Sequence, residues 1–192
     1  MKRVLLLLAE GFEIYEASVF IDVIGWNLTA GNGQTELFTC GLKKEVKSTF
    51  NQILIVDYVI DEIEIDDFEA LAIPGGFEEY NFYTDAYNHK FSEIIKSFHE
   101  KEKIIASICT GAFPVAKSGI LNDKNGTTYN QNPLRQEQLK NMGVNVINEP
   151  IVDDDNIITS WNPSTAMNVA FLLLERLTDK ENANLIKKKM GF

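Results

Sequence analysis

Residues Arg3–Leu8 form an almost uninterrupted apolar run near the start of the chain. A strand with one face in water alternates apolar and polar residues, whereas a strand covered on both faces is apolar throughout. Glu10 ends the run before it reaches the length of a secretory signal, and no small-residue cleavage site follows. The run therefore predicts a buried strand in a parallel sheet.

The rest of the chain alternates between strand and helix patterns, as in repeated βαβ units. Strands are predicted over Thr35–Cys40, Glu69–Ile73, Lys103–Ile108, Val144–Ile147 and Ile157–Ser160, with a hairpin or strand excursion and an acidic connector over Val46–Ile65 and a short candidate strand over Thr127–Tyr129. Helices are predicted over Tyr15–Thr29, Ala86–Lys101, Gly111–Lys117, Pro133–Met142 and Ser164–Leu177.

Local signals define some of the boundaries of these elements. Gly31-Asn32-Gly33 is expected to end the first helix, and Ser164 is expected to be the N-cap of the helix it begins. No internal repeat or Pro/Ser-rich linker interrupts the pattern. Residues 1–192 are therefore expected to form a single doubly wound α/β domain.

Charge and cysteine content exclude several classes of partner. The net charge of −10 argues against binding to nucleic acid or to an anionic membrane. The basic run Lys187–Lys189 suits the carboxyl end of a final helix. No apolar stretch is long enough to cross a membrane, and two cysteines do not make a disulfide framework, so we expect a cytoplasmic protein. Histidines and cysteines lack metal-ligand spacing, and no metal or other cofactor is expected.

The strand-to-helix junction at Cys109 carries the strongest chemical signal. Small residues, Ser107 and Gly111, flank this cysteine at positions minus two and plus two, as glycines flank the serine in the G-x-S-x-G turn of hydrolases. In such a turn the first free amides of the helix face the thiol and favour the thiolate. The pattern predicts a reactive thiol, although a free cysteine is also often just a small buried residue. Cys40, at the end of a predicted strand, is expected to be buried and inert.

Two other loops follow predicted strands, and such loops meet at one edge of a parallel sheet. Gly75 and Gly76 follow the strand that ends at Ile73, and their amides, with that of Thr110, are candidates for an oxyanion hole. Pro-Gly-Gly is equally typical of a simple tight turn. Glu16 lies about one helical turn past the first loop, where it either hydrogen-bonds the sulfur or only complements the helix dipole.

The charge state of Glu16 decides whether it can assist the thiol. An ionised carboxylate beside a thiolate would raise the pKa of the thiol, which is the wrong direction for activation. A protonated Glu16, with its pKa raised by burial and by the sulfur, would instead donate a hydrogen bond to the thiolate. The two groups would then titrate as a coupled pair.

These three segments resemble the ThiJ/PfpI superfamily, whose members are class I glutamine amidotransferase-like. The likeness is carried by the loop with Glu16, by Ile73-Pro74-Gly75-Gly76 and by Ala106–Gly111, and it extends to the Thr159–Thr165 turn. The superfamily includes the parkinsonism-associated protein, glyoxalase III- and deglycase-like proteins, PfpI-type proteases and isonitrile hydratases. The resemblance implies a flavodoxin-like, mostly parallel sheet with helices on both faces, a homodimer, Cys109 as nucleophile and Glu16 as its partner.

The chain departs from the superfamily in its histidines. Thr110 stands where the protease-like branch has a histidine, and Tyr129 and Asn130 follow Thr127-Thr128 where another branch has one. Neither His89 nor His99 falls in a matching motif, and His99 is expected to face solvent. A Cys-His protease triad is therefore not expected, and Tyr129 or Asn130 is the candidate third member of the site.

Three functions from different classes fit these observations. The first is a cysteine-dependent hydrolase or lyase acting on small carbonyl, amide-like or nitrile-like compounds, with Glu16 shuttling the proton. The second is a stress protein oxidised at Cys109, and the third is a noncatalytic binding domain. Thiazole biosynthesis is disfavoured because no phosphate-cradling loop with a lysine is present. The expected partners are a small-molecule substrate and a second copy of the chain. Four aromatic residues are candidates to narrow the pocket, or else core or dimer contacts: Phe12, Tyr15, Phe77 and Trp161.

Overall fold

A seven-stranded sheet forms the centre of the computed structural model, which describes all residues 1–192. Its strands are β1 (Lys2–Leu8), β2 (Thr35–Gly41), β5 (Tyr58–Val59), β6 (Ala70–Ile73), β7 (Ile104–Ser107), β10 (Ile151–Asp154) and β11 (Ile157–Ser160). Across the sheet they run in the order β10-β11-β7-β6-β1-β2-β5. Every neighbouring pair is parallel except β10 with β11. The doubly wound, mostly parallel α/β fold is confirmed.

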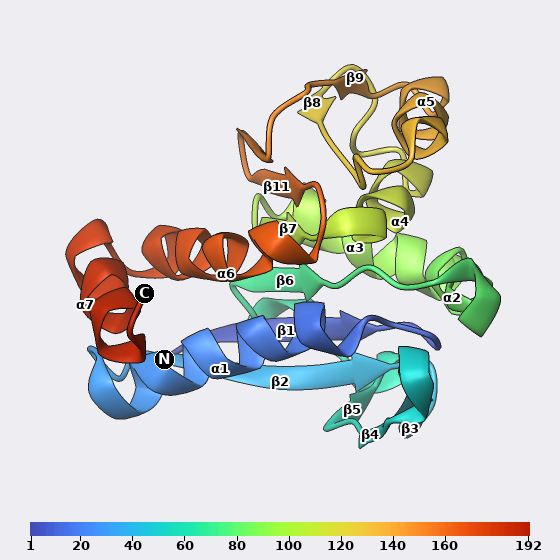
Figure 1. Cartoon of the computed structure of the whole chain (residues 1–192). Coiled ribbons are helices and arrows are strands. Elements are labelled where there is room, and N and C mark those ends of the chain that lie inside the picture. The colour runs from blue at the N-terminus through green and yellow to red at the C-terminus, as the bar shows by residue number, and fades with distance from the viewer.

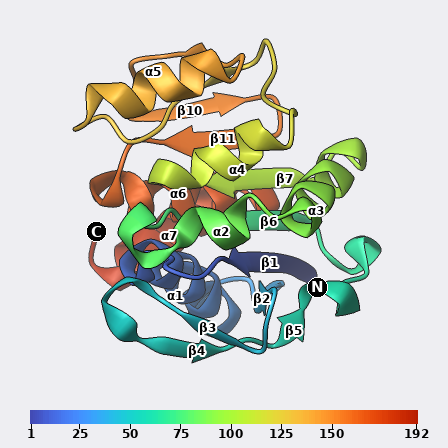
Figure 2. The ribbon, with the colours of Figure 1, turned by 90° about the vertical axis from the view of Figure 1, so that its right-hand side faces the viewer.

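Helices cover both faces of this sheet, as Figures 1 and 2 show. They are α1 (Ile14–Ala30), α2 (Phe82–Ala86), α3 (His89–Glu100), α4 (Ala112–Lys117), α5 (Pro133–Asn141), α6 (Pro163–Leu177) and α7 (Lys180–Met190). One buried cluster joins the sheet to α1, α6 and α7, and a second joins it to α3 and α4. None of these helices combines the length and the apolar character needed to cross a bilayer.

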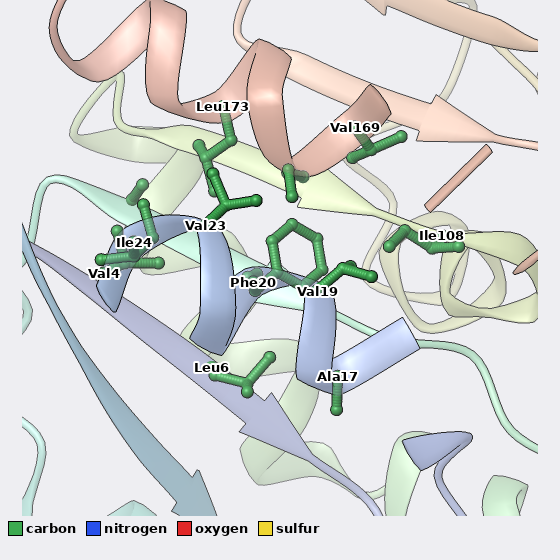
Figure 3. Packing of buried hydrophobic residues seen from close by; sticks show 14 of the residues in the cluster. Val4, Leu6, Ala17, Val19, Phe20, Val23, Ile24, Ile108, Val169 and Leu173 are labelled. Carbon is green, nitrogen blue, oxygen red and sulfur yellow. The ribbon is translucent and has the colours of Figure 1, made fainter. Parts of the chain in front are cut away.

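The apolar run near the start of the chain serves both clusters. Val4 and Leu6 of β1 point toward α1 and α6, where Phe20, Val23 and Val169 pack over them (Figure 3). Leu5 and Leu7, which alternate with them along the strand, belong to the cluster under α3 and α4. Val4, Leu5 and Leu6 are all 0% exposed. Burial of each such side chain contributes about 1.5–3 kcal/mol, which explains why the strand has no polar face.

Small additional strands flank the main sheet. The predicted excursion after β2 contains the antiparallel hairpin of β3 (Glu45–Lys47) and β4 (Ile53–Ile55). The Gly11 N–H donates to the Lys47 carbonyl at 2.7 Å, which holds this hairpin against the loop after β1. Next to β10 and β11, two short strands pair in parallel: β8 (Asn125–Gly126) and β9 (Asn145–Val146).

Some predicted boundaries are wrong for identifiable reasons. The strand expected over Thr127–Tyr129 lies earlier, at β8, because the Thr127 N–H donates to the Thr159 hydroxyl at 2.9 Å instead of joining a ladder. Asn162, not Ser164, caps α6: its side chain accepts from the Ser164 N–H at 3.0 Å, and Pro163 occupies the first helical turn.

Two more differences concern whole elements. The helix expected from Ala86 is divided in two, because Asn88 caps α3 through its side chain and Ala86 belongs to α2. Strand β10 was not predicted. It pairs with the core only through β11, at the edge of the sheet, where its acidic residues meet water. The expected helix end at Gly31 and the lysines in the last turn of α7 are confirmed.

Candidate active site

The candidate site lies where the strand order reverses. In chain order, the five central strands run 2-1-3-4-5 across the sheet, and ligands of such folds bind outside the carboxyl ends at the reversal between the first and third strands, here β1 and β6. Glu16 follows β1, Gly75 and Gly76 follow β6, and Cys109 follows β7. The Glu13 N–H donates to the Gly75 carbonyl at 2.7 Å, so the first two loops are joined directly. The predicted meeting of the three loops is confirmed.

Cys109 occupies the sharp turn that its neighbours predict. Its φ is +57°, a left-handed conformation that is rare for residues other than glycine and typical of strained functional positions. A Cβ atom on Gly111 would lie 2.6 Å from the Ile73 carbonyl oxygen, so the chain cannot turn here with a larger residue. The Thr128 hydroxyl donates to the Cys109 carbonyl at 2.7 Å and holds the turn from outside. The thiol is thereby held at the base of a cleft.

Glu16 is a buried carboxyl, not a helix-dipole residue in water. It is 0% exposed, and its Oε2 accepts from the Gly75 N–H at 2.7 Å. Its Oε1 is buried and has no nitrogen or oxygen partner, and the Cys109 thiol lies beside the carboxyl. Burial raises the pKa of Glu16 to about 8, against the opposing hydrogen bond from Gly75. Glu16 is therefore mainly protonated at neutral pH, as predicted, but its hydrogen bond with the Cys109 sulfur lowers its pKa instead of raising it.

Burial also acts on the thiol, and it opposes the effect of the turn. Burial raises the pKa of Cys109, the charge of Glu16 raises it further, and the Thr110 amide hydrogen bond lowers it. The net direction is the reverse of what the helix amides alone predict. The contribution of Glu16 requires an ionised carboxylate, so it operates only above about pH 8, where Glu16 loses its proton.

The two glycines after β6 have a different role from the one predicted. The Gly75 amide is used by Glu16, and the Gly76 amide donates to the Thr110 hydroxyl at 2.9 Å. Neither is a free oxyanion donor, so that part of the prediction needs correction. A Cβ atom on Gly75 would lie 2.7 Å from Thr110 Oγ1 and 2.9 Å from Glu16 Oε2. The bare backbone at Gly75 therefore positions the acid, and of the three predicted amides that of Thr110 is the one directed at the sulfur.

The cleft above Cys109 has a volume of about 250 Å³, which suits a small molecule. Glu16, Cys109 and Thr110 form its base, together with Gly76. Of the two candidate third members, Tyr129 lines the cleft. Asn130 does not, because its Oδ1 accepts from the Asn162 side-chain amide at 2.8 Å.

Several residues of the cleft were not predicted. Glu13, Glu78, Glu79, Asn132 and Arg135 all line it. Pro133 at the start of a predicted helix was a usable signal, because it places Asn132 at the N-cap and Arg135 in the first turn. Nothing in the sequence shows that this helix, α5, faces Cys109.

Arg135 is firmly held at one wall of the cleft. Its Nη2 pairs with Glu78 Oε2 at 3.0 Å. Its guanidinium lies over the rings of Tyr83 and Phe113, at 5.7 and 6.0 Å from their centroids. Its Nη1 donates to the Gln138 side chain at 3.1 Å, so both terminal nitrogens are engaged.

The remaining candidates lie away from the reacting groups. Of the four aromatic residues, only Phe77 lines the cleft; Phe12 is core, and Tyr15 is exposed. His89 is exposed and outside the cleft. His99 is half-buried with its Nδ1 enclosed and unpartnered, so the expectation that it faces solvent is wrong.

Cys40 and the other metal-ligating side chains offer no second centre. Cys40 is 0% exposed, and burial raises the pKa of its thiol to about 12, as expected for an inert cysteine. No group of three or more His, Cys, Asp or Glu side chains is arranged to hold a metal ion. The cleft at Cys109 is therefore the candidate reactive centre.

Known proteins resemble this chain in sequence and in fold. The model of the DJ-1/PfpI family matches residues 2–176. Uncharacterized protein MJ0967 of Methanocaldococcus jannaschii is 31% identical over 134 residues, which is 66% of this chain and 64% of that protein. Deglycase PYRAB04690 of Pyrococcus abyssi is 28% identical over 84% of this chain and 90% of its own length. The crystal structure of Drosophila melanogaster DJ-1beta superposes with a TM-score of 0.86 at 26% identity, covering 98% of this chain and 97% of that chain. The chain belongs to the DJ-1/PfpI family.

Proposed function

We propose that this protein is a cysteine-dependent enzyme that acts on small carbonyl compounds, with Cys109 as nucleophile and Glu16 as the group that carries the proton. One observation carries the proposal: Glu16 is a wholly buried acid with a pKa of about 8, and its one unpartnered oxygen lies at the base of a cleft beside a thiol. A general base is most effective when its pKa lies near the operating pH. The name of the deglycase relative supports the same class of chemistry.

The first step follows from the order in which the pair titrates. Glu16 gives up its proton near pH 8, before the thiol, whose pKa burial raises further. The ionised carboxylate then accepts the thiol proton as the sulfur attacks the carbonyl carbon. A C–S bond forms, the C=O π pair moves to oxygen, and Glu16 passes the proton to that oxygen. The product is a neutral hemithioacetal, and Glu16 is again ionised.

For an α-oxoaldehyde such as methylglyoxal, the same two residues suffice for turnover. Glu16 removes the proton from the former aldehyde carbon, which gives an enediolate, and returns it to the neighbouring ketone carbon. The hydroxyl proton of the first carbon passes to the oxygen of the second, and the product is a thioester on Cys109 with a neighbouring hydroxyl. Water cleaves the C–S bond and releases lactate and the thiol. No external oxidant or reductant is needed, because one carbon is oxidised as its neighbour is reduced. The role of Tyr129 in this proposal is to hydrogen-bond the substrate from the wall of the cleft.

Turnover of methylglyoxal to lactate by four proteins tests the proposal. Cys109→Ala should abolish turnover, and Glu16→Gln should lower it by about 10²-fold or more. Cys40→Ser removes the other thiol and should leave the rate unchanged. The rate of the unmodified protein should rise with pH and level off above about pH 8, where Glu16 is ionised.

Each alternative result assigns a different function. Turnover that survives in Cys109→Ala would refute the nucleophile. Absent turnover, together with rapid addition of two oxygen atoms to Cys109 by dilute peroxide, would favour the redox sensor instead. A thiol that neither turns over carbonyls nor oxidises would leave the noncatalytic binding domain.

A further inference from the structure

More acidic than basic residues line the cleft. Three carboxylates, those of Glu13, Glu78 and Glu79, line its walls, and Arg135 is the one basic residue that does so. Glu78 pairs with Arg135, whereas Glu13 and Glu79 take part in no ion pair. Glu16, also in the lining, is mainly neutral at pH 7 because burial raises its pKa to about 8. The cleft therefore carries a surplus of negative charge around the thiol.

Arg135 does not cancel this surplus for an incoming ligand. Its guanidinium is engaged by Glu78 at 3.0 Å and lies 5.7 and 6.0 Å from the ring centroids of Tyr83 and Phe113. With Nη2 on Glu78 and Nη1 on Gln138, the guanidinium does not present both terminal nitrogens freely for the bidentate contact that a carboxylate or phosphate prefers. Arg135 thus acts as part of the wall.

A second observation shows that the cleft is built to receive a polar group. Glu16 Oε1 is buried, lacks a nitrogen or oxygen partner and belongs to a residue that lines the cleft. Because Oε2 accepts from the Gly75 N–H and the carboxyl is mainly protonated at pH 7, its hydrogen resides on Oε1, and a ligand oxygen that accepts this hydrogen, such as a carbonyl oxygen, would satisfy the group. The acidic walls and this oxygen surround the same small volume above Cys109.

We propose that the cleft selects carbonyl compounds that carry a positive charge, such as an ammonium or guanidinium group, and that Glu79 and Glu13 are the residues that set this preference. The proposal rests on the proposed function for the chemistry of Cys109. Clefts lined by one sign of charge concentrate ligands of the opposite sign and raise their association rates by about 10- to 10³-fold. Oxo acids, which carry a carboxylate next to the carbonyl, are correspondingly disfavoured.

Thiol reagents that differ only in charge test this without any turnover. Methanethiosulfonates with a trimethylammonium, a neutral methyl or a sulfonate tail react with the Cys109 thiolate to form an S–S bond and release methanesulfinate. The rates at Cys109 are measured by intact mass at low ionic strength, in a Cys40→Ser background. The ratio of the cationic to the anionic rate should exceed that of N-acetylcysteine by at least about tenfold. Salt at about 0.5 M should remove most of this excess, because it screens the field at the exposed rim.

Variants assign the preference to individual residues. Glu79→Gln and Glu13→Gln should each lower the ratio several-fold, and glutamine at position 13 keeps an oxygen that can cap the Glu16 amide. Glu181→Gln, an exposed carboxylate on α7, is the matched control and should leave the ratio unchanged. Arg135→Gln should raise the ratio, because it leaves Glu78 unbalanced; a fall in this variant would overturn the assignment.

The outcomes separate this proposal from the enzymatic one. A charge ratio equal to that of the free thiol overturns the substrate preference even if methylglyoxal is turned over. A high ratio that depends on Glu79, together with no carbonyl turnover, supports the charge selection while the proposed function fails. A high ratio that survives in both Glu79→Gln and Glu13→Gln would refute the role of these two residues.

Discussion

Replacing Glu16 by glutamine should change how the stability of the protein depends on pH. Glutamine has the same shape, and its amide oxygen can accept from the Gly75 N–H as Glu16 Oε2 does at 2.7 Å. It has no proton to lose in this range. The substitution therefore removes one titration from the folded state and leaves the backbone contact that holds the side chain.

The sign and size of the effect follow from the raised pKa. Between 4.5, the ordinary pKa of the side chain, and about 8, its pKa in the folded protein, the folded state binds one more proton than the unfolded state. The free energy of unfolding therefore falls as pH rises through this window. A rise in pKa from 4.5 to about 8 corresponds to about 5 kcal/mol in the free energy of unfolding. This stabilisation is fully present below pH 4.5 and is lost above about pH 8.

The assay is urea unfolding followed by tryptophan fluorescence, between about pH 5 and pH 9. The free energy of unfolding of Glu16→Gln minus that of the unmodified protein should increase across this range by several kcal/mol, up to the value above. Other titrations cancel in this difference. Glu79→Gln, an exposed carboxylate of the same cleft, should show a flat difference. A flat difference for Glu16→Gln as well would mean that the pKa of Glu16 is not raised in the folded protein, and the predicted plateau of turnover above about pH 8 would be wrong with it.

Four further outcomes are expected. Gly75→Ala should cost about 1–3 kcal/mol in urea unfolding and abolish methylglyoxal turnover, since its Cβ would meet two oxygens within 3 Å; normal turnover would contradict this. In a Cys109→Ser background, Cys40 should resist iodoacetamide in the folded protein and react only in urea, and labelling without urea would show that it is not inert. Asn162→Ala should lower the free energy of unfolding by about 1 kcal/mol through loss of the α6 cap. If two copies pair through the outer face of α1, Trp26→Glu at its exposed position should give a monomer by light scattering, and an unchanged mass would place the interface elsewhere.

The fold was predictable because its signals are local and mutually consistent. The apolar run of β1, the glycine after α1 and the small residues around Cys109 each specify their own backbone. Parallel strands then place the loops after β1, β6 and β7 at one edge by geometry alone. Errors fell where a side chain competed with a backbone pattern, as when Asn162 rather than Ser164 capped α6.

The pair of Cys109 and Glu16 was predictable from the sequence, but the walls of the cleft and its electrostatics were not. The positions of Cys109 and Glu16 follow from the motifs, whereas the raised pKa of Cys109 depends on how deeply the turn is buried. Likewise, the use of the Gly75 amide by Glu16 depends on an approach between residues 59 positions apart. The acidic walls depend on where α5 and the loop after β6 come to lie, and no local pattern encodes that placement.

The separation of 59 positions between Glu16 and Gly75 determines when the reacting pair can form during folding. The contact between Glu16 and Gly75 exists only once β1 and β6 lie side by side, so it closes late in assembly. Before that moment the acid is an ordinary solvated glutamate and the cysteine an ordinary thiol. A nascent or locally opened chain therefore has a thiol but no buried acid beside it to carry the proton to and from a carbonyl compound. Turnover of a carbonyl compound, which needs both groups, therefore requires the complete fold.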